Sequence, residues 1–240
     1  MPTSSLSVFF PCYNDAETIG SLVRDADTVL RGLTADYEII VVNDGSTDRS
    51  AAVLEALAAE IPRLLVITHP ANRGYGGALR SGFAAASKDL VFYTDGDGQY
   101  DVKELPLLVM LLSADVDFVN GIKMTRQDPP YRVFAGNVHK FVTRWCFWLP
   151  IIDVDCDFRL IRRSVLDRVR LRRNSGSICP ELVKKAQRAG ATFREVSVHH
   201  YARQSGGSQF FRPGRILRTY VDLIGLWFEL MVLRRGAGGA

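Results

Sequence analysis

Short apolar runs alternate with segments of helical periodicity about every 25 residues, and this rhythm constrains the fold more than any other feature of the chain. Runs that suit buried strands occupy residues 6–10, 38–42, 64–67, 90–94 and 116–120, and a further strand is expected at 192–198. Apolar residues at helical spacing fill most of the intervals. The alternation predicts βαβ units with right-handed crossovers, and therefore an α/β protein whose mostly parallel, Rossmann-like sheet is flanked by helices.

The size and composition fit one large domain. Of 240 residues, 47% are hydrophobic and 23% are charged, so a full core can be buried. The 30 Lys and Arg against 26 Asp and Glu give a net charge of +4, an excess too small to indicate nucleic-acid binding. Four cysteines without metal-ligand spacing are expected to be free thiols in a reducing compartment. The N-terminus does not resemble a signal peptide and no apolar window reaches 18 residues, so a cytoplasmic protein without an ordinary membrane span is expected.

Polar clusters follow the predicted strands, at residues 11–15, 43–48, 69–77 and 95–101. In sheets of this class, ligands bind at the carboxyl ends of the strands. The strongest cluster is Asp95-Gly96-Asp97-Gly98-Gln99. Two aligned carboxylates and a side-chain carbonyl form a hard oxygen site, so Asp95, Asp97 and Gln99 are predicted to bind Mg²⁺ or Mn²⁺. A metal there can bridge the phosphates of a nucleotide diphosphate.

This cluster has two other possible interpretations. An EF-hand loop would need Gly at its sixth position and Glu at its twelfth, where this chain has Tyr100 and Pro106, so that interpretation is rejected. A polar turn with helix-capping acids remains an alternative, because the same residue types favour turns.

The other clusters give weaker signals. Asp44, after the second strand, can accept hydrogen bonds from a nucleobase or ribose, while capping of the next helix is the competing role for this segment. The glycines at 74, 76 and 77 follow the third strand and match neither a dinucleotide fingerprint nor a Walker loop. They either contact a ligand or let a helix begin close to the sheet.

The order of these motifs resembles glycosyltransferase family 2. The residues that carry the resemblance are Pro-Cys-Tyr-Asn-Asp at 11–15, Asn-Asp-Gly-Ser-Thr-Asp at 43–48, the glycine-rich helix start and Asp-Gly-Asp at 95–97. Residues 153–159, Glu195-Val196 and residues 203–208 resemble its dolichol-phosphate mannosyltransferase-like branch, whose members act on polyprenyl phosphates. The resemblance covers about residues 6–210 and implies the GT-A fold.

The resemblance also implies roles for individual residues. The nucleotide-sugar donor would contact Pro11, Tyr13, Asp15, Val42, Asp44, Asp95, Gly96, Asp97, Lys123, Arg203 and Gln209. Arg132 would face the acceptor phosphate. Asp97, Asp157 and Arg159 are the predicted catalytic residues, with Asp95, Asp97 and Gln99 as metal ligands.

Several positions depart from the family pattern. The family often has Glu at position 15, Arg at position 123 and Lys at position 209, where this chain has Asp15, Lys123 and Gln209. Small residues usually precede the Phe-Arg pair, and here they are replaced by Cys156 and Asp157. These departures leave the sugar and the acceptor open.

The tail is predicted to be an amphipathic helix. We divide the chain into a catalytic domain at 1–212 and a tail at 213–240, in which a narrow polar stripe faces a wide apolar surface flanked by arginines. This pattern suits a peripheral helix at a membrane interface, and packing on its own domain or in a homo-oligomer is the alternative.

The predicted reaction is inverting transfer of a sugar from a GDP-mannose or UDP-hexose type donor to an acceptor, for which a polyprenyl phosphate is favoured. A soluble hydroxyl acceptor is the alternative, and it would need a general base such as Asp155 or Asp157. A nucleotidyltransferase and a non-catalytic nucleotide-binding protein are the other two classes; the first usually has a glycine-rich loop after its first strand, and this chain has Pro-Cys-Tyr-Asn-Asp there.

Overall fold

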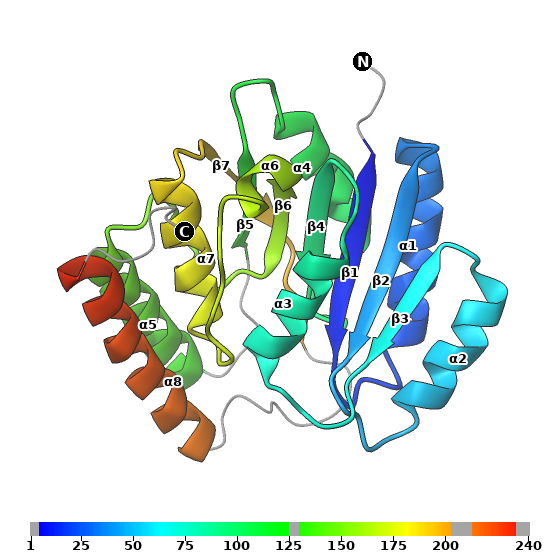
Figure 1. Cartoon of the computed structure of the whole chain (residues 1–240), viewed down its shortest axis with the longest axis horizontal. Coiled ribbons are helices and arrows are strands. Elements are labelled where there is room, and N and C mark those ends of the chain that lie inside the picture. The colour runs from blue at the N-terminus through cyan, green and yellow to red at the C-terminus, as the bar shows by residue number, and fades with distance from the viewer. Residues whose placement is uncertain (1–4, 125–129, 203–212, 234–240) are drawn as a thin grey trace.

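A seven-stranded sheet forms the centre of the structure, a computed structural model that describes residues 5–124, 130–202 and 213–233, without the side chains of 130–135, 137, 213, 215 and 216 (Figure 1). The strands are β1 (Leu6–Cys12), β2 (Tyr37–Asn43), β3 (Leu64–Thr68), β4 (Leu90–Thr94), β5 (Phe118–Lys123), β6 (Phe158–Arg162) and β7 (Phe193–Val198). The helices are α1 (Ile19–Leu33), α2 (Ser50–Glu60), α3 (Tyr75–Ala85), the 3₁₀ turn η1 (Val102–Glu104), α4 (Leu105–Leu111), α5 (Pro130–Phe147), α6 (Arg163–Leu166), α7 (Ile178–Arg188), α8 (Pro213–Trp227) and the π-helical turn η2 (Phe228–Val232).

The strand order is β3-β2-β1-β4-β6-β5-β7, and every neighbouring pair is parallel except those that include β6. This arrangement confirms the predicted mostly parallel α/β sheet with flanking helices. β6 is the strand that sequence periodicity did not predict. It is five residues long and runs antiparallel between β4 and β5.

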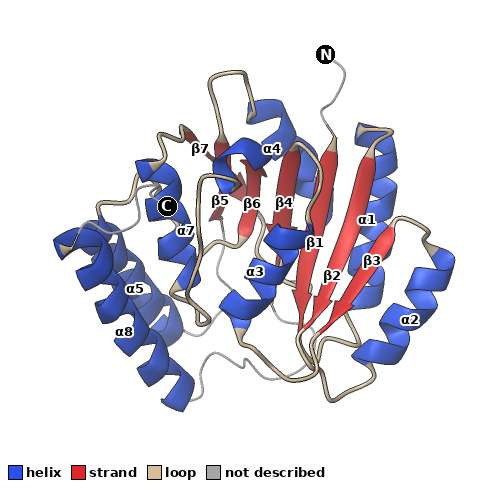
Figure 2. Cartoon of the chain, viewed as in Figure 1, coloured by secondary structure: helices blue, strands red, loops and turns tan. Residues whose placement is uncertain are grey.

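Helices cover both faces of the sheet (Figure 2). Helices α1, α2 and α4 bury Leu22, Leu54 and Leu105 in one core on one face. Helices α3, α7 and α8 bury Leu79 and other apolar side chains in a second core on the opposite face. Each fully buried Leu contributes roughly 1.5–3 kcal/mol relative to an exposed one. The two cores fix the sheet from both sides and hold the carboxyl ends of β1, β2 and β4 at a common edge.

Helices α5 and α8 lie side by side beyond α7 (Figure 1). Trp227 donates its indole N–H to the carbonyl of Cys146 at 3.0 Å, and the rings of His139 and Tyr220 meet edge to face at 5.6 Å. From the tail, Leu223, Leu226 and Leu230 enter the second core. The tail therefore packs on the same core as α7, and the predicted boundary at 212/213 falls at the edge of a stretch outside the described residues.

The outward side of α8 is apolar. Leu217, Val221 and Ile224 are 60–69% exposed, whereas Glu229 faces Arg173 of the domain. On α5, Phe141 and Trp145 are more than 60% exposed as well. Part of the polar stripe is thus turned toward the protein, and part of the wide apolar surface faces outward. In the described part of the chain, no helix is both long and apolar enough to span a membrane.

Close contact between α3 and β1 depends on Gly82. A Cβ placed there would lie 2.3 Å from the ring of Phe9, which stacks on Tyr93 at 5.3 Å and meets Phe83 edge to face. Because these rings are buried on all sides, Phe9 has no room to move.

We predict that Gly82→Ala lowers the free energy of unfolding by about 1–3 kcal/mol through overpacking. Gly20→Ala is the matched control, because its nearest atoms would lie 3.6 Å away and alanine favours a helix interior. Urea denaturation monitored by circular dichroism measures both. Equal midpoints for the two variants would contradict the packing argument.

Candidate active site

The carboxyl edge of the sheet brings together acids from two strands of opposite direction. In the β4–β6 ladder, Tyr93 pairs with Arg159 and Thr94 with Phe158, so continuation of the register sets Asp95 opposite Asp157. Opposed residues of an antiparallel pair project to the same side of a sheet. The short strand β6 therefore turns the acidic segment at 153–157 back onto the edge where Asp95 lies.

Asp95 has its pKa shifted by its surroundings. Burial, then the nearby charges of Asp157 and Asp97, raise the pKa of its carboxyl group well above the usual range. The phenol of Tyr75 donates to Asp95 Oδ1 at 2.8 Å. This bond and the positive charge of Lys123 act to lower the pKa of Asp95. A bound cation would stabilise the ionised form of these closely spaced carboxyl groups.

The loop after Asp95 is held close to β1. A Cβ at Gly96 would lie 2.5 Å from the carbonyl oxygen of Pro11, and the Thr18 hydroxyl donates to the Gly96 carbonyl at 2.8 Å. Asp97 Oδ1 accepts from the backbone N–H of Gln99 at 3.1 Å. The amide nitrogen of Gln99 donates to the carbonyl of Tyr201, so its amide oxygen is the end that can ligate a cation.

The oxygen donors of Asp95, Asp97 and Gln99 fit Mg²⁺ or Mn²⁺ by their chemistry. Within the described residues, no group of three or more His, Cys, Asp or Glu side chains is placed to hold a metal ion. A site built on two carboxylates would take its remaining ligands from water and substrate phosphates, as magnesium sites commonly do.

Arg159 is fully buried, and each nitrogen of its guanidinium group has a partner. It donates to Asn120 Oδ1 at 2.8 Å, to the Tyr93 hydroxyl at 2.6 Å and to the carbonyl of Val154. It also lies 3.4 Å from Asp157 Oδ1. The guanidinium group is thus enclosed by protein, which places Arg159 as a support for Asp157 and Tyr93, and its predicted catalytic role stays a prediction.

Asp157 is similarly enclosed. Its Oδ1 accepts from the Tyr93 hydroxyl and from the Cys179 thiol, each at 3.2 Å. Burial raises the pKa of Cys179 well above its usual value, and it raises the pKa of Cys12 and of Cys156 to about 12. The raised pKa values favour the protonated form of these three thiols. All four cysteines are free, as predicted.

Lys123 closes the site on the β5 side. Its ammonium group donates to the carbonyl of Asp155 at 2.7 Å, and its backbone N–H donates to Asp153 Oδ2. From α5, Lys140 pairs with Asp153 at 3.1 Å, and His139 lies 3.7 Å from Asp155. The acidic segment is thus fastened to the helix that carries the exposed aromatic side chains.

Asp44 fixes the loop that precedes α3. Its Oδ1 lies 2.6 Å from His69 Nδ1 and accepts from the backbone N–H of Arg73, while its Oδ2 accepts from Gly74 N at 3.0 Å. His69 Nε2 lies 2.9 Å from the Ser81 hydroxyl. This network gives Asp44 a structural role, and its contact with the donor stays a prediction.

The first loop presents the remaining donor residues. The buried carboxylate of Asp15 accepts from the backbone N–H of Tyr13, and the backbone N–H of Asp15 donates to the Ser50 hydroxyl at 3.2 Å. Val42 is fully buried in the core beside α3, so any contact with the donor would come from its backbone. Arg203 and Gln209 lie outside the described residues, as does the side chain of Arg132.

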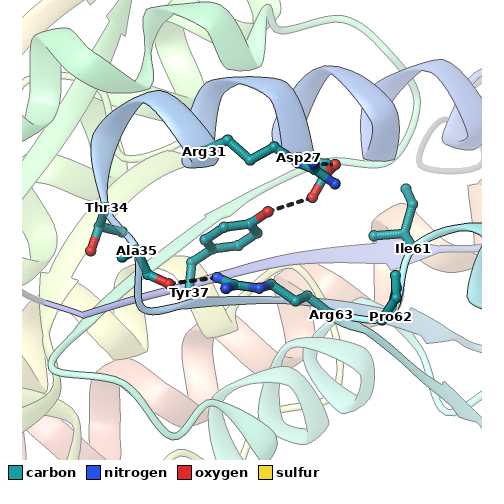
Figure 3. A pocket seen from close by; sticks show the side chains of 8 residues that line it. All are labelled: Asp27, Arg31, Thr34, Ala35, Tyr37, Ile61, Pro62 and Arg63. Carbon is teal, nitrogen blue, oxygen red and sulfur yellow. Dashed lines mark hydrogen bonds and ion pairs between the residues drawn. The ribbon is translucent and has the colours of Figure 1, made fainter.

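A hollow elsewhere on the molecule does not belong to this site (Figure 3). It is lined by Asp27, Tyr37 and Arg63 among others, and Tyr37 donates to Asp27 at 2.6 Å. Because Tyr37 begins β2, the hollow lies at the opposite end of the sheet from Asp95.

The family model for glycosyl transferase family 2 matches residues 7–170, a span that contains all of these acids. The chain belongs to this family. The predicted resemblance is thereby confirmed, and as a family 2 member the chain is a glycosyltransferase.

Curated relatives of this family 2 chain carry the name undecaprenyl-phosphate 4-deoxy-4-formamido-L-arabinose transferase. The protein from Serratia proteamaculans (strain 568) is 31% identical over 232 residues, which cover 96% of this chain and 68% of the relative. The protein from Pseudomonas fluorescens (strain Pf0-1) is 30% identical over 93% of this chain and 65% of its own length. The chain thus spans about two thirds of the length of these relatives, whose names agree with the predicted polyprenyl-phosphate branch.

Solved structures confirm the GT-A fold. Glucosyl-3-phosphoglycerate synthase from Mycobacterium tuberculosis, in complex with Mn²⁺, UDP and phosphoglyceric acid, superposes with a TM-score of 0.69 at 20% identity, covering 94% of this chain and 78% of that one. Its complex with Mg²⁺ and UDP gives a TM-score of 0.68 at 19% identity, covering 92% of this chain and 80% of that one.

Several residues of the site escaped sequence reasoning, among them Tyr75, Tyr93 and His69. These three had a visible signal. Tyr93 precedes Asp95 by two residues in a strand and so projects to the same face, while His69 and Tyr75 lie in the polar cluster after the third strand. Their partners are Asp157 for Tyr93, Asp44 for His69 and Asp95 for Tyr75. These contacts depend on tertiary structure, which the local sequence pattern does not contain.

We predict that Arg159→Lys lowers the free energy of unfolding by about 2–5 kcal/mol, because an ammonium group donates from a single nitrogen and cannot reach all three acceptors that the guanidinium fork meets, and each buried acceptor left without a hydrogen bond costs about 1–3 kcal/mol. Arg194→Lys, on the exposed part of β7, is the control and should change stability by less than about 0.5 kcal/mol. Guanidinium denaturation of both variants measures the difference. Similar stabilities would show that the network around Arg159 contributes little.

Proposed function

We propose that this chain transfers a sugar, with inversion at the anomeric carbon, from a nucleotide-diphosphate sugar to a polyprenyl phosphate. The observation that carries the proposal is the crowding of Asp95, Asp97 and Asp157 at the carboxyl edge of the sheet, in a chain of family 2. The donor is of the GDP-mannose or UDP-hexose type. The curated relatives, named for an undecaprenyl-phosphate acceptor, support the acceptor class.

Asp95, Asp97 and Gln99 would hold Mg²⁺ or Mn²⁺. When bound, the metal supplies positive charge that stabilises the departing nucleotide diphosphate. The Mycobacterium tuberculosis enzyme of the same fold, which contains Mn²⁺ or Mg²⁺ together with UDP, supports this use of a metal. Tyr13, Asp15 and Asp44 would contact the nucleotide, and Arg203 and Gln209 would also bind the donor.

The acceptor determines whether a base is needed. A phosphate monoester has a second pKa near 6 and is already largely ionised at neutral pH, so it can attack without a general base. Arg132 would provide the positive charge that docks it. A hydroxyl acceptor is the second candidate, and the raised pKa of Asp155, caused by its burial, would suit a general base.

The exposed apolar side of α5 and α8 supports contact with an anionic lipid surface. Phe141, Trp145 and Ile224 are 61–69% exposed, and the exposed residues Arg144 and Arg218 lie on the same two helices. Apolar side chains can enter the interface while the arginines pair with lipid head groups. A lipid acceptor resides in that bilayer, so such contact would bring the active site to its substrate.

Activity provides the first test. With a divalent metal, a polyprenyl phosphate and either UDP- or GDP-sugars, wild-type protein should release a nucleoside diphosphate and form a glycosyl lipid. Asp97→Asn should lower the rate by roughly 10²–10³-fold, because several kcal/mol of charge stabilisation depend on the metal site. EDTA should have a comparable effect.

Asp101→Asn serves as the control, because Asp101 caps η1 through an oxygen that Asn retains. Release of pyrophosphate would instead indicate a nucleotidyltransferase. Rapid transfer to a soluble hydroxyl compound, with polyprenyl phosphate inactive, would replace the lipid acceptor and make Asp155 and Asp157 the leading base candidates.

Membrane contact is tested with point variants, because deletion of residues 213–240 would also uncover the core around Leu226. The double variant Phe141→Ser, Ile224→Ser should weaken binding to phosphatidylglycerol-rich vesicles by about tenfold or more, since each buried side chain contributes roughly 1.5–3 kcal/mol. Binding of wild-type protein should also weaken with salt. Vesicle co-sedimentation measures both effects.

Met110→Ser is the matched control, since Met110 is 81% exposed on α4, away from this surface. Its vesicle affinity should equal that of wild type. Loss of affinity in Met110→Ser but not in the double variant would place the lipid contact elsewhere.

A further inference from the structure

Tyr75 lies at the first residue of α3 and reaches the acid edge of the sheet. Its hydroxyl donates to Asp95 Oδ1 at 2.8 Å, and its ring is packed against the second core. This hydrogen bond holds one carboxylate oxygen of Asp95 in place. Because a carboxylate group is planar, the direction of its second oxygen is then fixed as well. The orientation of Asp95 therefore depends on where α3 begins.

The start of α3 is set by direct contact between two backbones. A Cβ at Gly74 would lie 2.5 Å from the carbonyl oxygen of Asn174, and a Cβ at Gly76 would lie 2.3 Å from that of Arg173. The N–H of Gly76 donates to the carbonyl of Asn174 at 2.9 Å. Because no side chain separates the two segments, a shift of residues 173–174 must shift Tyr75.

Two glutamates hold the segment at 172–174 from the other side. Glu181, which is fully buried, accepts from the backbone N–H groups of Arg172 and Arg173 at 2.9–3.1 Å. Glu229, in the η2 continuation of α8, forms an ion pair with Arg173 at 2.7 Å. One end of this chain of contacts is thus the tail, and the other is the carboxylate of Asp95.

We propose that Tyr75 is a positioning residue for Asp95, and that the segment at 172–174 ties Tyr75 to α8 through the Arg173–Glu229 ion pair. The placement of the tail is thereby transmitted to the metal side of the donor site. This inference rests on the function proposed above, and it adds a link between the exposed apolar helix and the chemistry.

The first test compares two tyrosine hydroxyls. Tyr75→Phe removes only the bond to Asp95, and Tyr37→Phe removes an equivalent bond to Asp27 at the opposite end of the sheet. We expect Tyr75→Phe to weaken Mn²⁺ binding, measured by electron paramagnetic resonance with saturating UDP or GDP, by about tenfold, which is the scale of one hydrogen bond to a charged group. Tyr37→Phe should leave Mn²⁺ affinity unchanged.

The second test addresses the link to α8. Glu229→Gln should weaken Mn²⁺ binding by roughly threefold, a fraction of the effect of Tyr75→Phe because it acts through intermediate contacts. It should also speed hydrogen exchange in the peptide at 72–82, whose Gly76 amide bonds to Asn174. Glu60→Gln, which breaks the exposed pair with Arg24, is the control for both measurements. In the double variant Tyr75→Phe, Glu229→Gln, the fold-loss of Mn²⁺ affinity should be smaller than the product of the losses in the two single variants.

The outcomes are distinguishable. Unchanged Mn²⁺ affinity in Tyr75→Phe overturns the positioning role. Unchanged exchange at 72–82 in Glu229→Gln overturns the link to the tail, and this readout needs neither metal nor activity. If Glu229→Gln speeds exchange at 72–82 but wild-type protein transfers no sugar, the proposed function fails while the mechanical link stands.

Discussion

Like charges gathered at one edge of the sheet are the constraint on which the rest of the site depends. Asp95 and Asp157 are brought opposite each other because β6 runs antiparallel to β4. Burial and mutual repulsion raise the pKa of Asp95, and the surroundings supply the compensation: a phenol from Tyr75 and positive charge from Lys123. A parallel β6 would have carried Asp157 to the far end of the sheet. The direction of one short strand thus decides whether these acids meet.

Local periodicity was enough to predict most of the fold. The runs at 6–10, 38–42, 64–67 and 90–94 appear as β1 to β4, because fully buried parallel strands are continuous apolar segments bounded by turn residues. Periodicity failed at β6, a five-residue strand that Arg159 interrupts. The hydrogen-bonding groups of this arginine are satisfied by tertiary partners such as Asn120 and Tyr93. The candidate site shows the same division. Asp95 and Asp97 followed from their place after a strand, whereas Tyr75 and His69 depend on contacts across the sheet edge that spacing does not reveal.

The tail shows how an amphipathic pattern can have more than one solution. A polar stripe on a helix is ordinarily assigned to water and the apolar side to the domain. Here Glu229 turns inward to Arg173, and Leu226 on the neighbouring stripe enters the core, so both kinds of residue face the protein. The helix was predicted from sequence, but its rotation about its own axis follows from the leucines that enter the core and from the ion pair with Arg173.

That rotation has a consequence for handling the protein. Apolar side chains of α5 and α8, such as Trp145 and Ile224, share one outward surface that water solvates poorly. In a lipid-free buffer, this surface can be buried against the same surface of a second molecule. The state of association should therefore vary with protein concentration and with added detergent. Sedimentation profiles recorded without detergent would then report a reversible contact through these helices, and a single oligomeric state should not be assigned from one condition.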